Sequence, residues 1–135
     1  MRVLNYLSLP NPQAGGLVVF TIPPRIGCVT QIVCFRADID PGAAIRTVKL
    51  RFETQHENGV SKIDIHGPLQ PVNAIMQIQW AIGFSSTLGA ILDENVNMEL
   101  PSHWWAERDL KVTLDPNNGT ISLASVWWDY IPITG

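Results

Sequence analysis

Charged side chains are scarce in this sequence. Lysine, arginine, aspartate and glutamate make up 16% of its 135 residues, whereas an ordinary soluble domain carries about 25%. Basic residues are also outnumbered by acidic ones, because the formal net charge is −3. A nucleic-acid-binding surface needs clustered lysine and arginine to displace counterions from phosphates, so we expect no nucleic-acid partner. The shortage of charge favours a protein whose surface is partly covered by another subunit.

Cysteines and long apolar runs are scarce as well. The two cysteines, Cys28 and Cys34, stand in one expected strand, where they would lie about 20 Å apart at a rise of roughly 3.3 Å per residue. That separation excludes a disulfide between them, and we expect both to be small buried side chains. No apolar run approaches the ~20 residues of a membrane span, and the first residues contain no signal-peptide core. We therefore expect no membrane contact and synthesis in a cytoplasm.

Motifs of catalysis are missing too. The sequence contains neither G-x-S-x-G nor a glycine-rich phosphate loop. Asp64 and His66 would lie on the same face of a strand, but a metal site takes three or four protein ligands. A small cupin-like enzyme on a β architecture would need His66 together with His103. That enzyme is a minority alternative, and we expect a non-enzymatic protein with no cofactor and no metal.

What the sequence does contain is a repeated alternation of apolar and polar residues. A period of two is typical of antiparallel strands with one buried face. The pair Asn58-Gly59 predicts a tight hairpin, and the turn residues Pro116–Gly119 predict a closing hairpin from Leu110 to Val126. The residues expected on the inner faces are Val48, Leu50, Phe52, Ile63, Ile65, Met76, Ile78, Trp80, Val96, Met98, Leu100, Leu110, Val112, Leu114, Ile121 and Leu123.

Strands of this length and spacing predict the fold class. Eight or nine short strands separated by turns indicate a single-domain antiparallel β-sandwich. We expect this all-β domain to cover residues 17–135, with a short helix or turn at residues 84–95. Residues 1–16 combine a short apolar stretch with a segment rich in proline and glycine. Because proline cannot donate to a sheet ladder, we expect an N-terminal arm or edge strand joined by a flexible hinge.

Two tryptophan pairs stand out among the aromatic residues: Trp104-Trp105 and Trp127-Trp128. Adjacent residues of a strand face opposite sides, so each pair should place one indole inward and one outward. An indole that is exposed in the isolated domain often becomes buried at the centre of a protein interface, or serves as a platform on which a sugar stacks. The plainer alternative is that one pair plugs an end of the sandwich while the other packs in the core and under the arm. The candidate contact residues are Val3, Leu4, Tyr6, Leu7, Trp104, Trp105, Trp128 and Tyr130.

Several short segments of the sequence, taken in their order, resemble those of a known group of proteins. They are Val18-Val19-Phe20-Thr21-Ile22-Pro23-Pro24, Gly27-Cys28-Val29, Leu100-Pro101 with Trp104 or Trp105, Asp109-Leu110-Lys111-Val112-Thr113-Leu114, and a last strand rich in tryptophan. In this order they resemble the small jelly-roll structural proteins of tailed-phage virions. The resemblance covers most of the chain after residue 16.

The resemblance implies a jelly-roll sandwich and a virion component without catalytic activity. The expected role is that of a head decoration (cement) protein, a homotrimer that contacts the major capsid protein through its arm and loops. Many modest contacts repeated by symmetry are enough to stabilise such a particle. The protein would then be made in the host cytoplasm and reside in the virion. The alternative is a receptor- or carbohydrate-binding fibre or spike module that stacks sugars on an exposed Trp104 or Trp105.

Overall fold

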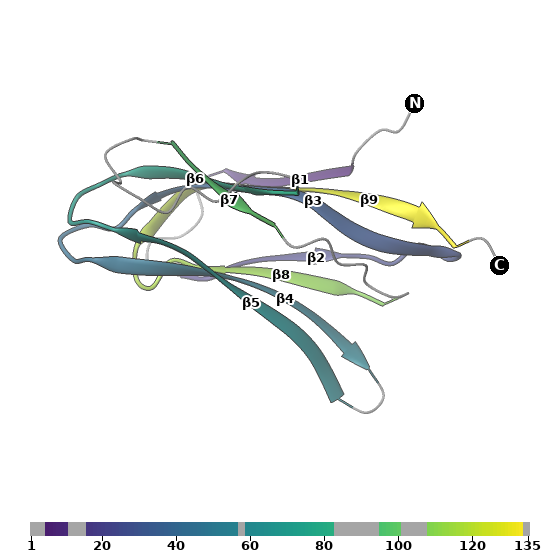
Figure 1. The fold of residues 1–135 in the computed structure, drawn as a ribbon. Helices are drawn as coiled ribbons and strands as arrows, with labels where there is room; N and C mark the ends of the chain where they lie inside the picture. Colours follow the sequence, from purple (N-terminus) through teal and green to yellow (C-terminus); the bar gives the residue numbers. More distant parts are fainter. Residues whose placement is uncertain (1–4, 11–15, 57–58, 83–94, 101–107, 134–135) are drawn as a thin grey trace.

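The computed structural model describes residues 5–10, 16–56, 59–82, 95–100 and 108–133. Over these residues the chain forms strands and connections, without a helix (Figure 1). The strands are β1 (Asn5–Pro10), β2 (Val18–Ile22), β3 (Cys28–Asp40), β4 (Arg46–His56), β5 (Gly59–Gln70), β6 (Met76–Ala81), β7 (Asn95–Glu99), β8 (Leu110–Asp115) and β9 (Thr120–Pro132).

Two sheets pack face to face. One has the strand order β1-β9-β3-β6-β7 and the other has the order β2-β8-β4-β5 (Figure 1). Without β7, each sheet has four strands. In the first sheet the first strand, β1, pairs with the last, β9. In the second sheet the next strand from the N-terminus, β2, pairs with β8, the next from the C-terminus. This interleaving of strands in two four-stranded layers is the connectivity of a jelly roll. The prediction of an all-β sandwich with eight or nine strands is confirmed.

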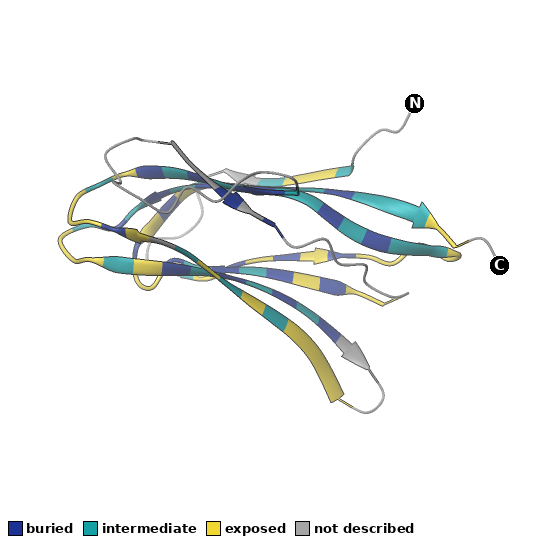
Figure 2. Ribbon diagram, viewed as in Figure 1, coloured by how far each residue is buried: buried dark blue, intermediate teal, exposed yellow. Residues whose placement is uncertain are grey.

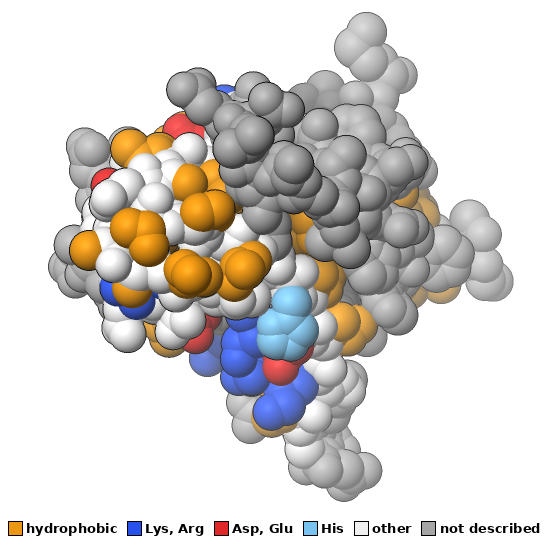
Figure 3. All heavy atoms as spheres, turned by 60° about the vertical axis from the view of Figure 1, so that its left-hand side comes forward, with side chains coloured by type: hydrophobic (Ala, Val, Ile, Leu, Met, Phe, Trp, Pro, Cys, Tyr) orange, Lys and Arg blue, Asp and Glu red, His pale blue; other side chains and the backbone are white. Residues whose placement is uncertain are grey.

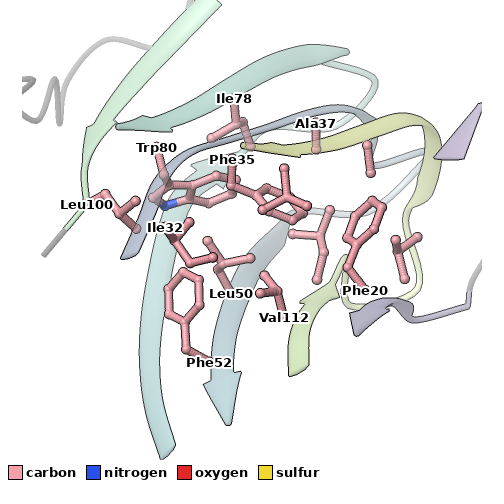
Figure 4. Packing of buried hydrophobic residues seen from close by; sticks show 14 of the residues in the cluster. Phe20, Ile32, Phe35, Ala37, Leu50, Phe52, Ile78, Trp80, Leu100 and Val112 are labelled. Carbon is pink, nitrogen blue, oxygen red and sulfur yellow. The ribbon is translucent and has the colours of Figure 1, made fainter. Parts of the chain in front are cut away.

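Inward-facing side chains fill the space between the sheets. The burial colours alternate along the strands (Figure 2), and the side chains of both layers meet in one core (Figure 4). Phe35 lies at its centre, with its ring edge-on to Phe20 at 5.9 Å and to Trp80 at 6.0 Å between ring centroids. Because strand alternation sends every second residue inward, the expected inner positions of β4, β6 and β8 are confirmed as buried.

The turn after β8 does not close a hairpin. β8 belongs to the four-stranded sheet and β9 to the five-stranded sheet, so the prediction of a hairpin from Leu110 to Val126 is wrong. Asn117 and Asn118 adopt φ values of 53° and 70°, and Gly119 N donates to Pro116 O at 3.0 Å. This turn carries the chain across the sandwich, because β8 pairs with β2 and β4 while β9 pairs with β3 and β1.

Strand β7 is parallel to β6, with Gln77 opposite Asn95 and Ala81 opposite Glu99. The expectation that the strand around Val96 is antiparallel is therefore wrong, although Met98 and Leu100 are buried as expected. Parallel neighbours need a long connection instead of a tight turn, and β6 ends at Ala81 while β7 begins only at Asn95. The helix or turn expected at 84–95 lies outside the described residues, except that Asn95 opens β7.

Two irregularities shift the pairing between β3 and β9. The register moves by one residue between Ile32 and Cys34 and moves back between Asp38 and Ile39. The second shift leaves Ser122 as an extra residue of β9, so Ile121 faces the core and Leu123 does not. The prediction that Ile121 and Leu123 share the inner face is wrong for this reason.

The cysteines are both free and half-buried instead of fully buried. The expectation that no disulfide joins them agrees with the structure. Cys34 follows the irregularity after Ile32 and pairs with Trp127, so it lies on the outer face of the five-stranded sheet. Burial nevertheless raises the pKa of the Cys34 thiol, which favours the neutral form.

The hairpin predicted at Asn58-Gly59 is confirmed, with β4 and β5 paired up to His56 opposite Gly59. Its tip residues, 57–58, lie outside the described part of the chain. The far end of the hairpin stands away from the rest of the sandwich (Figure 1).

Hydrogen bonds tie three connections together at one end of the sandwich. Arg46 donates from Nε to Pro41 O and from Nη1 to Asn117 O, each at 2.6 Å. Asn73 N donates to Gly42 O at 2.7 Å. The connections β3–β4, β5–β6 and β8–β9 therefore form one joined surface.

Candidate interaction surfaces

A group of exposed aliphatic side chains covers this joined end. Its members are each between 47% and 61% exposed, and we call them the connection patch: Ile45, Leu69, Val72 and Ile75. Figure 3 brings this end forward and shows hydrophobic side chains gathered on it. Single exposed apolar residues are common on proteins, but a group on one face is typical of an interaction site.

The backbone beneath the connection patch is held firmly. Gln70 is fully buried, and its Nε2 donates to Ile39 O at 3.1 Å. Ala74 N donates to Pro71 O at 3.1 Å and closes the turn in which Asn73 takes a φ of 59°. The patch therefore presents a pre-formed shape, which lowers the ordering cost of binding a partner.

A second candidate surface lies where β1 joins the sheet. The Tyr6 ring lies 4.9 Å from the Trp127 ring between centroids, at an interplanar angle of 38°. The pair stands directly across the strands, because Tyr6 is opposite Trp127 in the β1–β9 register. Tyr6 is 51% exposed and Trp127 is half-buried. We call this pair the aromatic pair.

Serine hydroxyls fix the tyrosine of the aromatic pair. The Tyr6 hydroxyl lies 3.4 Å from Ser125 Oγ, which in turn donates to Ser8 Oγ at 3.2 Å. The hydrogen bonds with Ser125 and Ser8 lower the pKa of Tyr6 below its usual value. A tyrosine held in this way offers a fixed aromatic face at the sheet edge.

The outer face of the four-stranded sheet is polar. Arg51 donates from Nε to Asp64 Oδ1 at 2.6 Å and from Nη2 to Asp64 Oδ2 at 3.1 Å. A hollow of about 70 Å³ on this face is lined by Leu17, Lys49, Arg51, Thr113 and Asp115. Because small-molecule sites usually occupy about 300–1,000 Å³, this hollow is too small to enclose a substrate.

The expected pair Asp64 and His66 lies on β5, where Asp64 bonds an arginine of β4. The Arg51 guanidinium bonds the Asp64 carboxylate and lowers its pKa. Within the described residues, no group of three or more His, Cys, Asp and Glu side chains could hold a metal ion. His103, the other histidine of the cupin-like alternative, lies outside those residues.

The predicted contact residues have different positions in the structure. Tyr6 and Leu7 are exposed on β1, whereas Trp128 is 6% exposed and packs in the core. Trp128 is therefore corrected from a contact residue to a core residue, and Trp127 is the outward member of that pair, as strand alternation requires. The predicted contact residues outside the described part of the chain are Val3, Leu4, Trp104 and Trp105.

Tyr130 contacts its own chain. Its hydroxyl donates to Pro23 O at 2.6 Å, and the Arg25 guanidinium lies 4.5 Å from its ring centroid. These contacts hold the β2–β3 connection against β9, so the structure gives Tyr130 an intramolecular role.

Sequence reasoning missed the connection patch. Its residues are single aliphatic side chains next to turn residues, such as Ile45 after Gly42 and Val72 after Pro71. An apolar side chain close to turn-forming residues is the sequence feature that could have indicated the patch. Only the fold brings these separate turns together.

No helix that could cross a bilayer occurs among the residues described. Comparisons with protein-family models, with curated proteins and with solved structures gave no match.

Proposed function

We propose that this chain is a non-enzymatic structural protein of a tailed-phage virion. Its role would be that of a head decoration protein, a homotrimer that binds the major capsid protein and stabilises the head. The resemblance of the sequence to small jelly-roll virion proteins supports this proposal, and the strand order of the two sheets agrees with it.

The connection patch is the observation that carries the binding role. Four aliphatic side chains stand exposed on the end of the sandwich where hydrogen bonds join the connections, in a chain with few charges. Burying them against a partner would release about 25 cal/mol for each Å² of apolar surface. One such contact is modest, but a particle repeats it many times by symmetry, and the total stabilises the assembly.

Strand β1 supports a role for the N-terminal segment. It is an edge strand that pairs with β9 and leaves Tyr6 and Leu7 exposed. Tyr6 of the aromatic pair belongs to residues 1–16, the arm expected to reach a neighbouring subunit, so this pair would take part in that contact.

The test measures occupancy on phage heads. Heads of the encoding phage are stripped of the protein, incubated with the purified full-length chain, and assayed for bound protein by sedimentation. Val72→Asp puts a charge into the connection patch and should lower occupancy at least about tenfold, which corresponds to 1.4 kcal/mol. The matched control is Val19→Asp, because Val19 on β2 is 46% exposed, close to the 47% of Val72, and lies outside the connection patch.

Each outcome has a distinct meaning. Binding of the wild type and of Val19→Asp, with loss in Val72→Asp, supports the proposal. Failure of the wild-type chain to bind heads contradicts the decoration role. Equal binding by all three chains contradicts the part assigned to the connection patch.

The second candidate function is carbohydrate or receptor binding in a fibre or spike. The aromatic pair favours it, because a half-buried indole beside an exposed phenol ring offers a face for sugar stacking. A glycan array should then show binding that Trp127→Ala or Trp105→Ala removes. An array without binding by the wild type would leave the decoration role as the proposal.

A further inference from the structure

The open edge of β5 has a charge pattern that matches its own copy. β5 is the last strand of the β2-β8-β4-β5 sheet, and among the described residues it pairs with β4 alone. It is a long strand, Gly59–Gln70, whereas exposed edge strands in proteins are usually kept short. An edge of this kind can pair with a strand of another chain.

Charged residues of β5 stand opposite residues of the other sign on β4. Lys62 stands opposite Glu53, and Asp64 stands opposite Arg51. All four side chains lie on the outer face of the sheet, and Lys62 and Asp64 are exposed. One row across the two strands therefore reads negative then positive, and the next row reads positive then negative.

The geometry points to antiparallel pairing of β5 with β5 of a second copy, about a two-fold axis at Ile63. A two-fold interface is self-complementary, so residue i meets residue j and j meets i. With the axis at Ile63, Lys62 lies opposite the partner's Asp64, and Asp64 lies opposite the partner's Lys62. Each row then alternates in sign across four strands: Glu53, Lys62, the partner's Asp64 and the partner's Arg51.

Neighbouring registers lack this match. An axis at Lys62 would place the two lysines opposite each other, and an axis at Asp64 would do the same to the two aspartates. Like charges directly opposite destabilise a strand pair, and opposite charges stabilise it. A shift by one residue would set outward side chains against inward ones. The register at Ile63 is therefore selected by charge.

The backbone allows the same register. With the axis at Ile63, the paired segment runs from Val60 to His66 and ends before Pro68, which has no N–H to donate. The half-buried Ile63 meets its copy on the inner side, so an apolar contact lies beneath the charged rows. The two four-stranded sheets would join into one continuous sheet.

This pairing does not depend on the proposed function. If the chain is a homotrimer through other surfaces, β5 would join two trimers about a two-fold axis. If it is not, β5 would form a dimer. In both cases, loss of the β5 contact halves the mass of the assembly.

The experiment is sedimentation equilibrium of the full-length chain over a range of concentrations at low salt. Lys62→Glu sets like charges opposite each other twice and should halve the mass. Asp64→Lys should do the same. The matched control is Lys111→Glu, a reversal of the same sign on the outer face of β8, which should keep the wild-type mass. Circular dichroism checks that every variant is folded.

Mixing the two disabled variants gives the sharpest test. In an equimolar mixture of Lys62→Glu and Asp64→Lys, the new carboxylate of one chain faces the new ammonium of the other, and the remaining native aspartate and lysine face each other as well. The mixture should recover the wild-type mass, which a merely misfolded pair would not do. Three results would each overturn the proposal. They are a wild-type mass that does not double as the concentration rises, a mass of Lys111→Glu that is halved like that of the β5 variants, and a mixture whose mass stays halved.

Discussion

Gly67 shows, at the level of single residues, how closely β5 packs against its neighbours. It lies in β5 at the pairing irregularity between Thr47 and Lys49 of β4. A Cβ atom at this position would overlap Cγ2 of Val48 and lie 3.1 Å from Cζ2 of Trp80. Both neighbours are fully buried, so neither side chain can make room by turning into solvent. Glycine is required by close approach, as is common at irregular strand pairs.

The first prediction concerns this glycine. Gly67→Ala should lower the free energy of unfolding by about 1–3 kcal/mol, because overpacking a closed core forces its neighbours to move. Urea denaturation measures the change. The control is a double-mutant cycle with Val48→Ala, which removes the overlapping methyl group and should reduce the cost of Gly67→Ala. An equal cost in both backgrounds would contradict the assigned clash.

At the level of an element, strand β9 shows how irregular pairing decides which side chains face the core. It pairs with β1 on one side and β3 on the other. The extra residue on β3 after Ile32 shifts the register, and the extra residue Ser122 on β9 restores it. The two irregularities compensate each other, so Ile121, Ala124, Val126 and Trp128 all face the core.

The second prediction is that a single deletion in β9 is tolerated at one serine and not at another. Removing Ser122 closes the irregularity and leaves every inward residue inward, so the variant should fold at a cost of about 1 kcal/mol. Removing Ser125 places Ala124 and Val126 out of phase and should abolish cooperative unfolding. Thermal melts followed by circular dichroism distinguish the two. A Ser125 deletion as stable as the Ser122 deletion would show that register is not what these residues define.

Apart from β4–β5 and β6–β7, the strand pairs of the described residues join strands that are far apart in the sequence. β1 pairs with β9, β2 with β8 and β3 with β9. Within the described residues, strands that follow one another in the sequence do not form a separate core, because one cluster of buried residues draws on strands from along the whole described chain. Stability is therefore shared across the sandwich, and the edges contribute least to it.

The third prediction follows from this layout. Hydrogen exchange should be slowest at the backbone amides that pair β3 with β9, because their hydrogen bonds break only when the whole domain unfolds. Amides of β1 and β7 should exchange faster, because each is an edge strand held by one neighbour. Exchange measured by mass spectrometry on peptides of the native chain tests this order. Protection of β1 equal to that of β3 would indicate that another surface covers the β1 edge.

Parts of the candidate surfaces were predictable from the sequence, and parts were not. Alternation predicts one inward and one outward indole at Trp127-Trp128, but not which one is outward, because the irregularity at Ser122 changes the phase of the strand. Tyr6 was predicted as a contact residue, and its partner in the aromatic pair comes from the β1–β9 register. The connection patch was not predicted, because its residues come from separate turns.

The sequence by itself determined the class of fold and the inner positions of most strands. The reason is local: the side chains of an extended backbone alternate with a period of two, whatever the strand pairs with. Only the tertiary structure decided that β8 and β9 lie in different sheets, that β7 runs parallel to β6, and that Ile45 and Ile75 share one surface. Those outcomes depend on contacts between residues distant in the sequence, which compete in free energy with every alternative pairing.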